Sequence, residues 1–313
     1  MLGTRASIAV VLALAVIAMG GCSTNGSAPG QSSAGGRNSP FQTTAGSATS
    51  PGPLSATSSP PSPAATETRP QPTTGSPPTP SNSAASGSCP SPSGLPITVA
   101  PGAGRTVALT FDDGASDDMA AVADALRASG VRVATFFDTG GNDAKATNVV
   151  QRVAAMGYLV ENHSWDHQYP TAVQGGWSIT YLRDQISRTA AQAARVTGTP
   201  QCFFRPPGGF TTNVQAASAA EGMSAVLWSV DTLDWKSPDH LDPSFQQQIV
   251  ARATTLTPDV ADHPMVLMHA GKASHEPERQ VHAFRGNTIA ALPAIVSWYR
   301  THGYTFVDLF GHT

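Results

Sequence analysis

The sequence predicts an α/β fold, a distorted (β/α) barrel of about seven parallel strands, preceded by a disordered N-terminal tether. From residue 98 onward, short apolar runs alternate with helical patterns, which is typical of a parallel sheet. The expected strands are apolar throughout, as in strands covered on both faces. Residues 22–88 are instead dominated by Ser, Thr, Pro, Gly and Ala. A closed or nearly closed barrel is therefore the preferred architecture, and an open doubly wound sheet is the alternative.

The first 21 residues are typical of a secretion signal. Arg5 supplies a positive start, and residues 8–19 form an apolar run of about a dozen residues, shorter than the roughly 20 that a membrane span needs. The sequence Met-Gly-Gly-Cys that ends at Cys22 resembles the lipobox of bacterial lipoproteins. We therefore expect an exported protein that is lipid-anchored through Cys22 at the outer face of the cytoplasmic membrane or in the cell wall. A secreted protein with an ordinary signal peptide is the alternative.

The segment of residues 22–88 is expected to be a linker. Its only aromatic residue is Phe41, and it carries few charges, so it buries too little apolar surface to offset its ordering entropy. A flexible coil of this length spans about 45 Å. The folded domain is then expected over residues 89–313.

Charge and cysteine content narrow the possible partners. The 313 residues have a formal net charge of −3, so the chain lacks the basic surface of a nucleic-acid-binding protein. Contact with a membrane is expected through the lipid anchor only. Of the three cysteines, Cys89 and Cys202 remain after Cys22, and an exported protein favours a disulfide between them over two unpaired thiols.

Each element of the domain follows from its local pattern. The first expected helix has Met119, Val122 and Leu126 on one side and Gly130 at its end. Pro293 either interrupts or starts the last helix. Strands are expected at residues 106–111, 131–137, 158–163, 202–204, 224–231, 264–270 and 304–309, and helices at 117–130, 146–157, 180–198, 214–222, 245–255 and 288–303.

The unusual polar residues follow the ends of the expected strands. They are Asp112, Asp113, His163, Arg205, Asp231, Asp234 and His269. The carboxyl ends of parallel strands share one face, where active sites lie in β/α folds. We therefore expect these side chains to converge.

Two histidines suggest a metal site at this face. His163 and His167 are four residues apart in His-Ser-Trp-Asp-His, a spacing that alone is weak. Two histidines and one carboxylate form a three-ligand zinc set that leaves a coordination position open. The aspartates of Thr-Phe-Asp-Asp-Gly, at another strand end, make the metal interpretation the better one.

Five motifs carry a resemblance to a known family. Thr-Phe-Asp-Asp-Gly, His-Ser-Trp-Asp-His, Arg-Pro-Pro-Gly-Gly, Asp-Thr-Leu-Asp-Trp and Leu-Met-His occur in this order. Their order and spacing resemble those of the polysaccharide deacetylases of carbohydrate esterase family four, the NodB-like domain. The resemblance covers about residues 104–310 and implies that residues 89–313 form the catalytic domain.

The resemblance implies a metal and a base. Asp113, His163 and His167 would hold Zn²⁺ or another divalent transition metal such as Co²⁺. Asp112 would be the general base that activates the attacking water. Arg205 would pair with this base and fix its orientation, and a surface arginine before a turn is the alternative.

The remaining motifs imply an acid and a pocket. His269 would be the general acid, oriented by Asp234, and a core histidine is the alternative. Trp235 and Leu267 would wall the acetyl pocket. Gly208 would contribute its backbone N–H to the oxyanion hole, although the family usually has Tyr at that position; Ala270 likewise replaces a residue that is often acidic.

The implied function is hydrolysis of acetyl groups on N-acetylated sugars of a polysaccharide. An N-acetylglucosamine-containing glycan is the expected partner, and the anchor and tether favour cell-wall peptidoglycan. An acetyl xylan esterase or chitin deacetylase acting on external glycans is the alternative within the same chemistry. A catalytically inactive glycan-binding lipoprotein is the alternative from a different class.

Overall fold

The computed structural model describes residues 89–272 and 284–313. The expected signal peptide, the lipidation of Cys22 and the linker of residues 22–88 lie outside the described residues and stay predictions. The domain boundary expected near residue 89 also stays a prediction.

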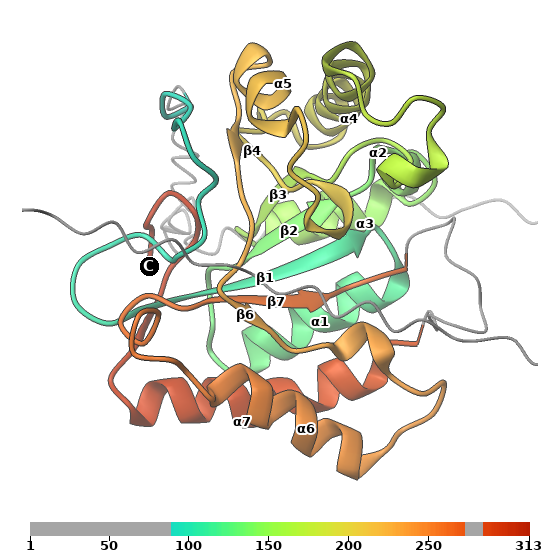
Figure 1. Cartoon of the computed structure of the whole chain (residues 1–313). Coiled ribbons are helices and arrows are strands. Elements are labelled where there is room, and N and C mark those ends of the chain that lie inside the picture. The colour runs from blue at the N-terminus through green and yellow to red at the C-terminus, as the bar shows by residue number, and fades with distance from the viewer. Residues whose placement is uncertain (1–88, 273–283) are drawn as a thin grey trace, which may run out of the picture. The chain divides into compact units, whose positions relative to one another are not determined.

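One parallel sheet forms the centre of the described domain (Figure 1). Seven strands follow the order β5-β4-β3-β2-β1-β7-β6, and β8 pairs with β1. The strands are β1 (Thr106–Gly114), β2 (Thr135–Asp138), β3 (Leu159–Asn162), β4 (Phe203–Phe204), β5 (Ser224–Ala225), β6 (Val230–Asp231), β7 (Met265–His269) and β8 (Thr305–Phe306). The α-helices are α1 (Asp117–Ala128), α2 (Gly140–Asp143), α3 (Thr147–Ala155), α4 (Ile179–Thr197), α5 (Val214–Ala220), α6 (Pro243–Thr254) and α7 (Gly286–Thr301), and short 3₁₀ turns are η1 (Pro170–Ala172), η2 (Pro207–Gly209) and η3 (Asp234–Lys236).

The sheet must curl because its two edge strands are close together along the chain. Only residues 226–229 separate β5 from β6, and so short a segment reaches about 17 Å at most. A flat sheet of seven strands would place its edges about 29 Å apart. Ile97 forms a parallel bridge with Val226, and Ala100 N donates to His263 O over 2.9 Å, so the segment before β1 lies across the remaining seam. The predicted barrel-like parallel sheet is confirmed as a curled half-barrel.

Strand β1 separates the helical layer from the interior of the half-barrel. Val107, Leu109 and Phe111 pack in the main core with residues of α1, α3, α6 and α7. Side chains alternate along a strand, so Thr110 and Asp112 face the opposite side. Asp112 therefore lies inside the half-barrel, near the carboxyl end of β1.

The prediction of a single strand at residues 224–231 is wrong. The structure has two short strands there, β5 and β6, at opposite edges of the sheet. Between them, Leu227 N donates to Ile97 O over 2.8 Å, and Leu227 O accepts from Arg205 Nη2 over 2.8 Å. Ser229 N donates to Met265 O over 3.1 Å. These backbone groups pair with three separate segments, so the chain crosses from one edge to the other.

Two helices begin earlier than expected. Helix α6 begins at Pro243, two residues early, because Asp242 accepts hydrogen bonds from the backbone N–H groups of Ser244 and Phe245. Helix α7 begins at Gly286, so Pro293 lies within the helix rather than at its start.

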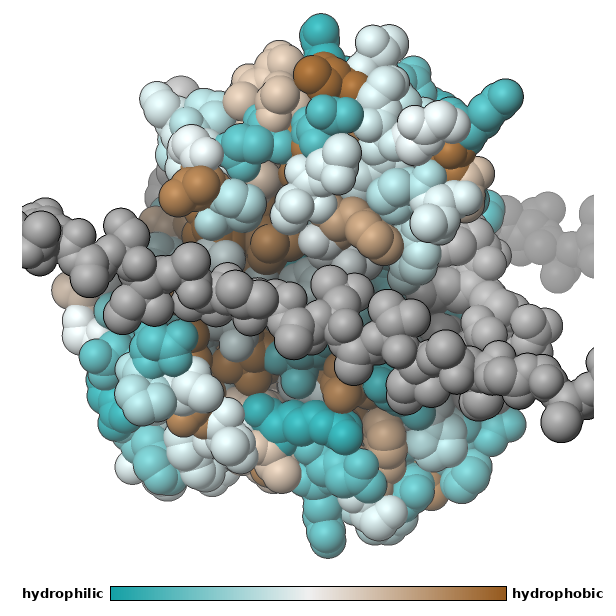
Figure 2. Space-filling model, viewed as in Figure 1, coloured by the Kyte–Doolittle hydropathy of each residue, from teal (hydrophilic) through white to brown (hydrophobic). Residues whose placement is uncertain are grey.

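The surface is mixed in character. On the face shown in Figure 2, hydrophobic residues of the described domain form small separate groups among polar ones. No helix within residues 89–272 and 284–313 is long and apolar enough to cross a membrane.

Candidate metal centre and active site

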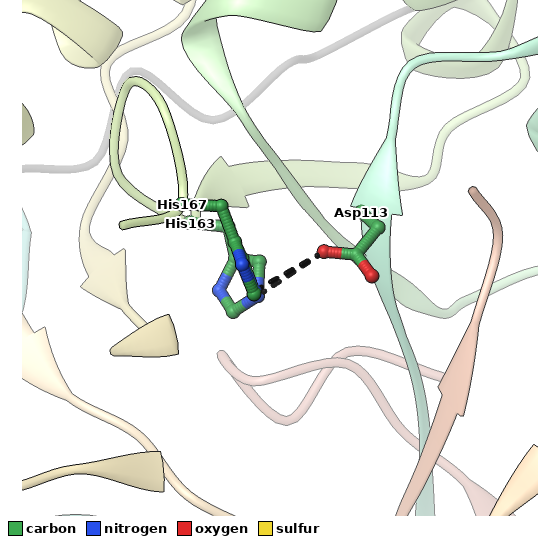
Figure 3. A group of neighbouring side chains, drawn as sticks. All are labelled: Asp113, His163 and His167. Atoms are coloured by element: carbon green, nitrogen blue, oxygen red, sulfur yellow. Dashed lines mark ion pairs between the residues drawn. The ribbon is translucent and has the colours of Figure 1, made fainter. Parts of the chain in front are cut away.

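Three side chains from two strand ends form a metal-binding group (Figure 3). One ligand atom from each of Asp113, His163 and His167 lies within 4.8 Å of the others, and all three residues are buried. Asp113 Oδ1 is 3.6 Å from His163 Nε2 and 3.4 Å from His167 Nε2. Side chains that the sequence separates by 50 residues therefore converge on one point.

Unusual backbone conformations aim these ligands. Asp113 has φ = 69°, and the pairing of β1 with β2 shifts register between Asp112 and Gly114. Such a bulge re-aims a side chain that regular alternation would send to the other face. Ser164 and His167 also have positive φ, so the His-Ser-Trp-Asp-His segment is a tight loop after β3 rather than a helix. Position 271 has no room for a side chain, because a Cβ there would collide with the backbone carbonyl oxygen of Asp113.

The donor set fits a divalent cation. Burial lowers the pKa of His163 to about 3, so its imidazole is neutral. Its Nδ1 lies 2.8 Å from Arg205 O, a carbonyl that only accepts, so Nδ1 carries the proton. The lone pair of Nε2 then faces Asp112 Oδ2 at 3.5 Å and Asp113 Oδ1 at 3.6 Å. Three electron-rich atoms brought this close favour a cation between them.

Asp112 is held by a buried arginine. Arg205 follows β4 and is fully buried, and its Nη1 donates to Asp112 Oδ1 over 2.7 Å and to Thr110 Oγ1 over 2.9 Å. The guanidinium also lies over the ring of Phe137, 4.1 Å from its centroid. One carboxylate oxygen of Asp112 is thus fixed by Arg205, while the other faces the metal-binding group.

His269 and Asp234 form a second ion pair at the same edge. His269 ends β7, and its Nδ1 is 2.8 Å from Asp234 Oδ1. Burial alone would lower the pKa of His269, but the charge and hydrogen bond of Asp234, with smaller effects of Asp113 and Asp112, raise it to about 9. Thr288 Oγ1 donates to the other oxygen, Asp234 Oδ2, over 2.7 Å. His269 is therefore a cation at neutral pH.

One pocket joins these groups. It is lined by Asp112, Asp113, His163, His167, Tyr169, Gly208, Trp228, Asp231, Trp235, Leu267 and His269. All the residues proposed from the sequence as ligands, base, acid or pocket wall are among them, and Arg205 and Asp234 lie directly behind Asp112 and His269. The sequence reasoning missed Tyr169 and Trp228. Tyr169 follows His167 by only two residues, which was the one signal available for it.

The space beside Gly208 is taken by two rings. Gly208 has φ = 61°, and a Cβ on it would lie 3.0 Å from Tyr169 Cε1 and 3.1 Å from Phe210 Cε2. The tyrosine expected at position 208 from the family pattern therefore has no room here. Tyr169 supplies an aromatic ring at this pocket wall from a different segment.

Cys89 and Cys202 form a disulfide, with Cα atoms 5.2 Å apart. The bond ties the segment before β1 to the residue that precedes β4. This places the crosslink next to the backbone that positions Arg205, three residues further on.

A buried pair of carboxyl groups lies near the site. Asp138 ends β2 and Asp143 ends α2, and both side chains are inaccessible. Burial, followed by the charge of Asp143, raises the pKa of Asp138 well above its usual range. Burial raises the pKa of Asp143 to about 7, although a hydrogen bond from Asp138 opposes the rise. A protonated Asp138 that donates to Asp143 accounts for both directions.

Asp138→Asn is expected to stabilise the protein at pH 8 by about 1–3 kcal/mol, the usual cost of a buried polar group without adequate partners. Folding of the wild type takes up protons wherever a folded pKa exceeds the unfolded value of 3.8, so its stability falls as pH rises from about 4 to about 7. The amide keeps a donor without titrating. Denaturant unfolding at pH 5 and pH 8 measures the effect, with the exposed Asp259→Asn as control. An equal loss of stability with pH in wild type and Asp138→Asn would show that Asp138 does not contribute to the pH dependence.

Comparisons with known proteins find relatives of one family. The family model described as polysaccharide deacetylase matches residues 100–226. The chain is 32% identical over 209 residues to a peptidoglycan-N-acetylglucosamine deacetylase of Bacillus cereus, covering 65% of this chain and 66% of that protein. It is 30% identical over 210 residues to a chitooligosaccharide deacetylase of Rhizobium leguminosarum bv. trifolii, covering 66% of this chain and 90% of that protein. A solved family 4 carbohydrate esterase from Streptomyces lividans, in complex with acetate, aligns with a TM-score of 0.53 at 28% identity, covering 65% of this chain and 92% of that one.

The chain belongs to the polysaccharide deacetylase family. It spans less than two thirds of the length of the first curated relatives that it matches. It covers 66% of the length of the Bacillus protein. It covers 19% of the length of a bifunctional xylanase/xylan deacetylase of Cellvibrio japonicus. That match is 34% identical over 131 residues, which are 41% of this chain.

Proposed function

We propose that this protein is a metal-dependent deacetylase that removes acetyl groups from N-acetylated sugars of cell-wall peptidoglycan. The supporting observation is that a metal-binding group, an arginine-held carboxylate and a histidine cation line one pocket. Asp113, His163 and His167 would hold the metal, Zn²⁺ or another divalent transition metal such as Co²⁺. When bound, such a metal supplies Lewis acidity, which polarises a carbonyl and makes water easier to deprotonate.

The chain's own residues would divide the proton transfers between them. Asp112, oriented by Arg205, takes a proton from the water that attacks the acetyl carbonyl. His269 is protonated at neutral pH and donates its proton to the departing nitrogen of the sugar. Asp234 holds the imidazole in the required orientation through its Nδ1.

The rest of the pocket would hold the acetyl group. Trp235 and Leu267 line the pocket with apolar surface that excludes bulk water from the methyl group. Gly208 lines the same pocket, and its backbone N–H is proposed to stabilise the negative charge that develops on the carbonyl oxygen. A backbone donor is retained although the position has lost its tyrosine.

The glycan is inferred from relatives and from the expected location. Among relatives at 30% identity or more, those of Bacillus cereus and Listeria monocytogenes act by name on peptidoglycan and cover 65% and 66% of this chain, whereas the bifunctional xylanase/xylan deacetylase covers 41%. A lipid anchor at Cys22 and the linker of residues 22–88 would place the enzyme beside the cell wall. Removal of acetyl groups from chitin or xylan is the second candidate, favoured by the chitooligosaccharide and xylan deacetylases among the relatives.

The test is acetate release by the full-length protein, stripped with chelator and then resupplied with zinc. The substrates are purified peptidoglycan, N-acetylglucosamine oligomers and acetylated xylan. Zinc-dependent release from peptidoglycan is the expected result. Release only from oligomers or xylan would move the function to external glycans, and no release from any substrate would favour an inactive glycan-binding protein.

Asp234→Asn is expected to lower kcat at pH 8 by about 10²-fold and to move the alkaline limb of its pH profile to lower pH. Without the charge of Asp234, burial lowers the pKa of His269 from about 9, and the acid loses its proton at a lower pH. Profiles of kcat between pH 5.5 and 10 measure the shift. Thr288→Val is the matched variant because it removes a hydrogen bond to the same carboxylate but keeps its charge. An alkaline limb that stays in place in Asp234→Asn would mean that His269 is not the group that titrates.

A further inference from the structure

Arg285 is fully buried, although it takes no part in the proton transfers proposed above. Of the arginines that the structure describes, only Arg205 is buried to the same extent, and that residue holds Asp112. Burial of a guanidinium is costly unless hydrogen bonds and charges inside the protein replace its contacts with water. The contacts of Arg285 therefore indicate what its burial achieves.

Arg285 holds the chain where it leaves β7. Its Nε donates to Gly271 O over 2.7 Å. The preceding residue, Ala270, donates from its N–H to Asp112 O over 2.8 Å and accepts at its carbonyl from Ser116 Oγ over 2.7 Å. We call Ala270 and Gly271 the strap. Three hydrogen bonds therefore fix the strap, one each to β1, to the N-cap of α1 and to the N-cap of α7.

The strap lies directly against the backbone of Asp113. A Cβ on Gly271 would collide with the carbonyl oxygen of Asp113, so this contact requires glycine. Asn142 Nδ2 also donates to the same oxygen, over 3.3 Å. The carbonyl of Asp113 is thus confined by the strap and by Asn142, and the peptide that follows Asp113 has little room to rotate.

This confinement matters because of the conformation of Asp113. Its φ of 69° lies in the left-handed region, which residues other than glycine adopt at an energetic cost. Such a conformation persists only where the surrounding structure enforces it. Relaxation to regular strand geometry would turn the carboxylate away from His163 and His167, and the strap blocks the peptide rotation that this relaxation requires.

We propose that Arg285 is a positioning residue for the metal centre, which acts through the strap to keep the Asp113 carboxylate aimed at the two histidines. This inference rests on the ligand set of the proposed function, but on neither its glycan nor its reaction. Thr288, three residues further along α7, donates to Asp234 Oδ2 over 2.7 Å. The start of α7 thus supports both the metal ligand and the partner of His269.

The charge of Arg285 and its hydrogen bond have opposite effects on metal binding. Arg285 contacts the strap and the strap contacts Asp113, so the guanidinium is close enough to repel a bound cation. Removal of this charge alone would raise zinc affinity. Removal of the hydrogen bond frees the strap, and loss of such an outer-shell contact typically lowers metal affinity by about 10- to 100-fold. The direction of the change therefore separates a positioning role from an electrostatic one.

The test measures zinc affinity of the full-length protein by competition with a chromophoric chelator, well below the melting temperature of each variant. Arg285→Met is expected to lower the affinity about tenfold, and Gly271→Ala at least as much. The double variant is expected to lose no more than Gly271→Ala alone, because Arg285 acts through the strap. Arg252→Met is the matched control, a half-buried arginine that donates to Thr232 O and does not contact the strap, and it should keep wild-type affinity.

Unchanged or higher zinc affinity in Arg285→Met would overturn the positioning role, as would losses that add in the double variant or an equal loss in Arg252→Met. If Arg285→Met does not fold, Arg285→Lys replaces it, because lysine keeps the charge and has a CH₂ group where arginine has Nε. A wild type that binds zinc but releases no acetate would contradict the proposed function and leave this test intact. A wild type that binds no zinc would overturn the positioning role together with the ligand set.

Discussion

Asp113→Ala is expected to abolish stoichiometric zinc binding and, with it, deacetylation. Asp113 is the only carboxylate of the metal-binding group, and its removal leaves two imidazoles, of which His163 is neutral. Loss of an outer-shell partner alone typically lowers metal affinity by about 10- to 100-fold, so loss of the charged ligand should exceed about 100-fold. Arg205 holds one oxygen of Asp112, which leaves only its Oδ2 facing the metal-binding group.

Metal content measured by inductively coupled plasma analysis after gel filtration tests this expectation. Asp166→Asn is the matched control: Asp166 lies between the two histidines in sequence, but its carboxylate accepts hydrogen bonds from Tyr181 Oη and Gln185 Nε2 and is not part of the metal-binding group. The control should retain one zinc per chain. Full occupancy in Asp113→Ala would show that the ligand assignment is wrong.

The sequence predicted the fold where local pattern and long-range pairing agree. Continuous apolar runs ended by polar residues placed β1 and β7 within a few residues of their observed bounds. The run at residues 224–231 is equally apolar, yet it divides into β5 and β6 because Ile97, Arg205 and Met265 each bind part of its backbone. Those partners are distant in sequence, and no local pattern reports them.

The site residues divide in the same way, into those that a local motif reports and those that depend on a distant segment. The metal-binding group, Arg205, Asp234 and His269 were found because short motifs carry them. Tyr169 was missed because its role depends on the absence of a side chain at Gly208, a relation between two segments. The resemblance assigned Asp112 and Asp113 different roles, but no pattern in the sequence predicted the positive φ that turns the Asp113 side chain towards the histidines. Asp138 follows an expected strand like the active-site residues, yet it is buried against Asp143 and does not line the pocket.

Asp112→Asn is expected to lower kcat by about 10²- to 10⁴-fold, the usual contribution of a general base, while zinc content stays at the wild-type level. The amide oxygen can still accept the hydrogen bond of Arg205 Nη1, so the side chain keeps its place beside the metal-binding group. What it loses is the ability to accept a proton from water. Some loss of stability is also expected, because Arg205 is fully buried and loses its counter-charge.

Substitutions at the adjacent positions 112 and 113 should therefore differ in zinc content although both lower turnover, and the same two assays, zinc content and acetate release, measure this. Asp112→Asn keeps the metal and loses turnover, whereas Asp113→Ala loses both. A folded Asp112→Asn protein, verified by circular dichroism, that retains wild-type turnover would place the base elsewhere. Loss of zinc from that variant would instead make Asp112 a ligand, a role that its oxygen at 3.5 Å from His163 Nε2 would then explain. The two carboxylates are separated by one peptide bond, and the register shift between Asp112 and Gly114, with the positive φ of Asp113, would give them the different roles proposed here.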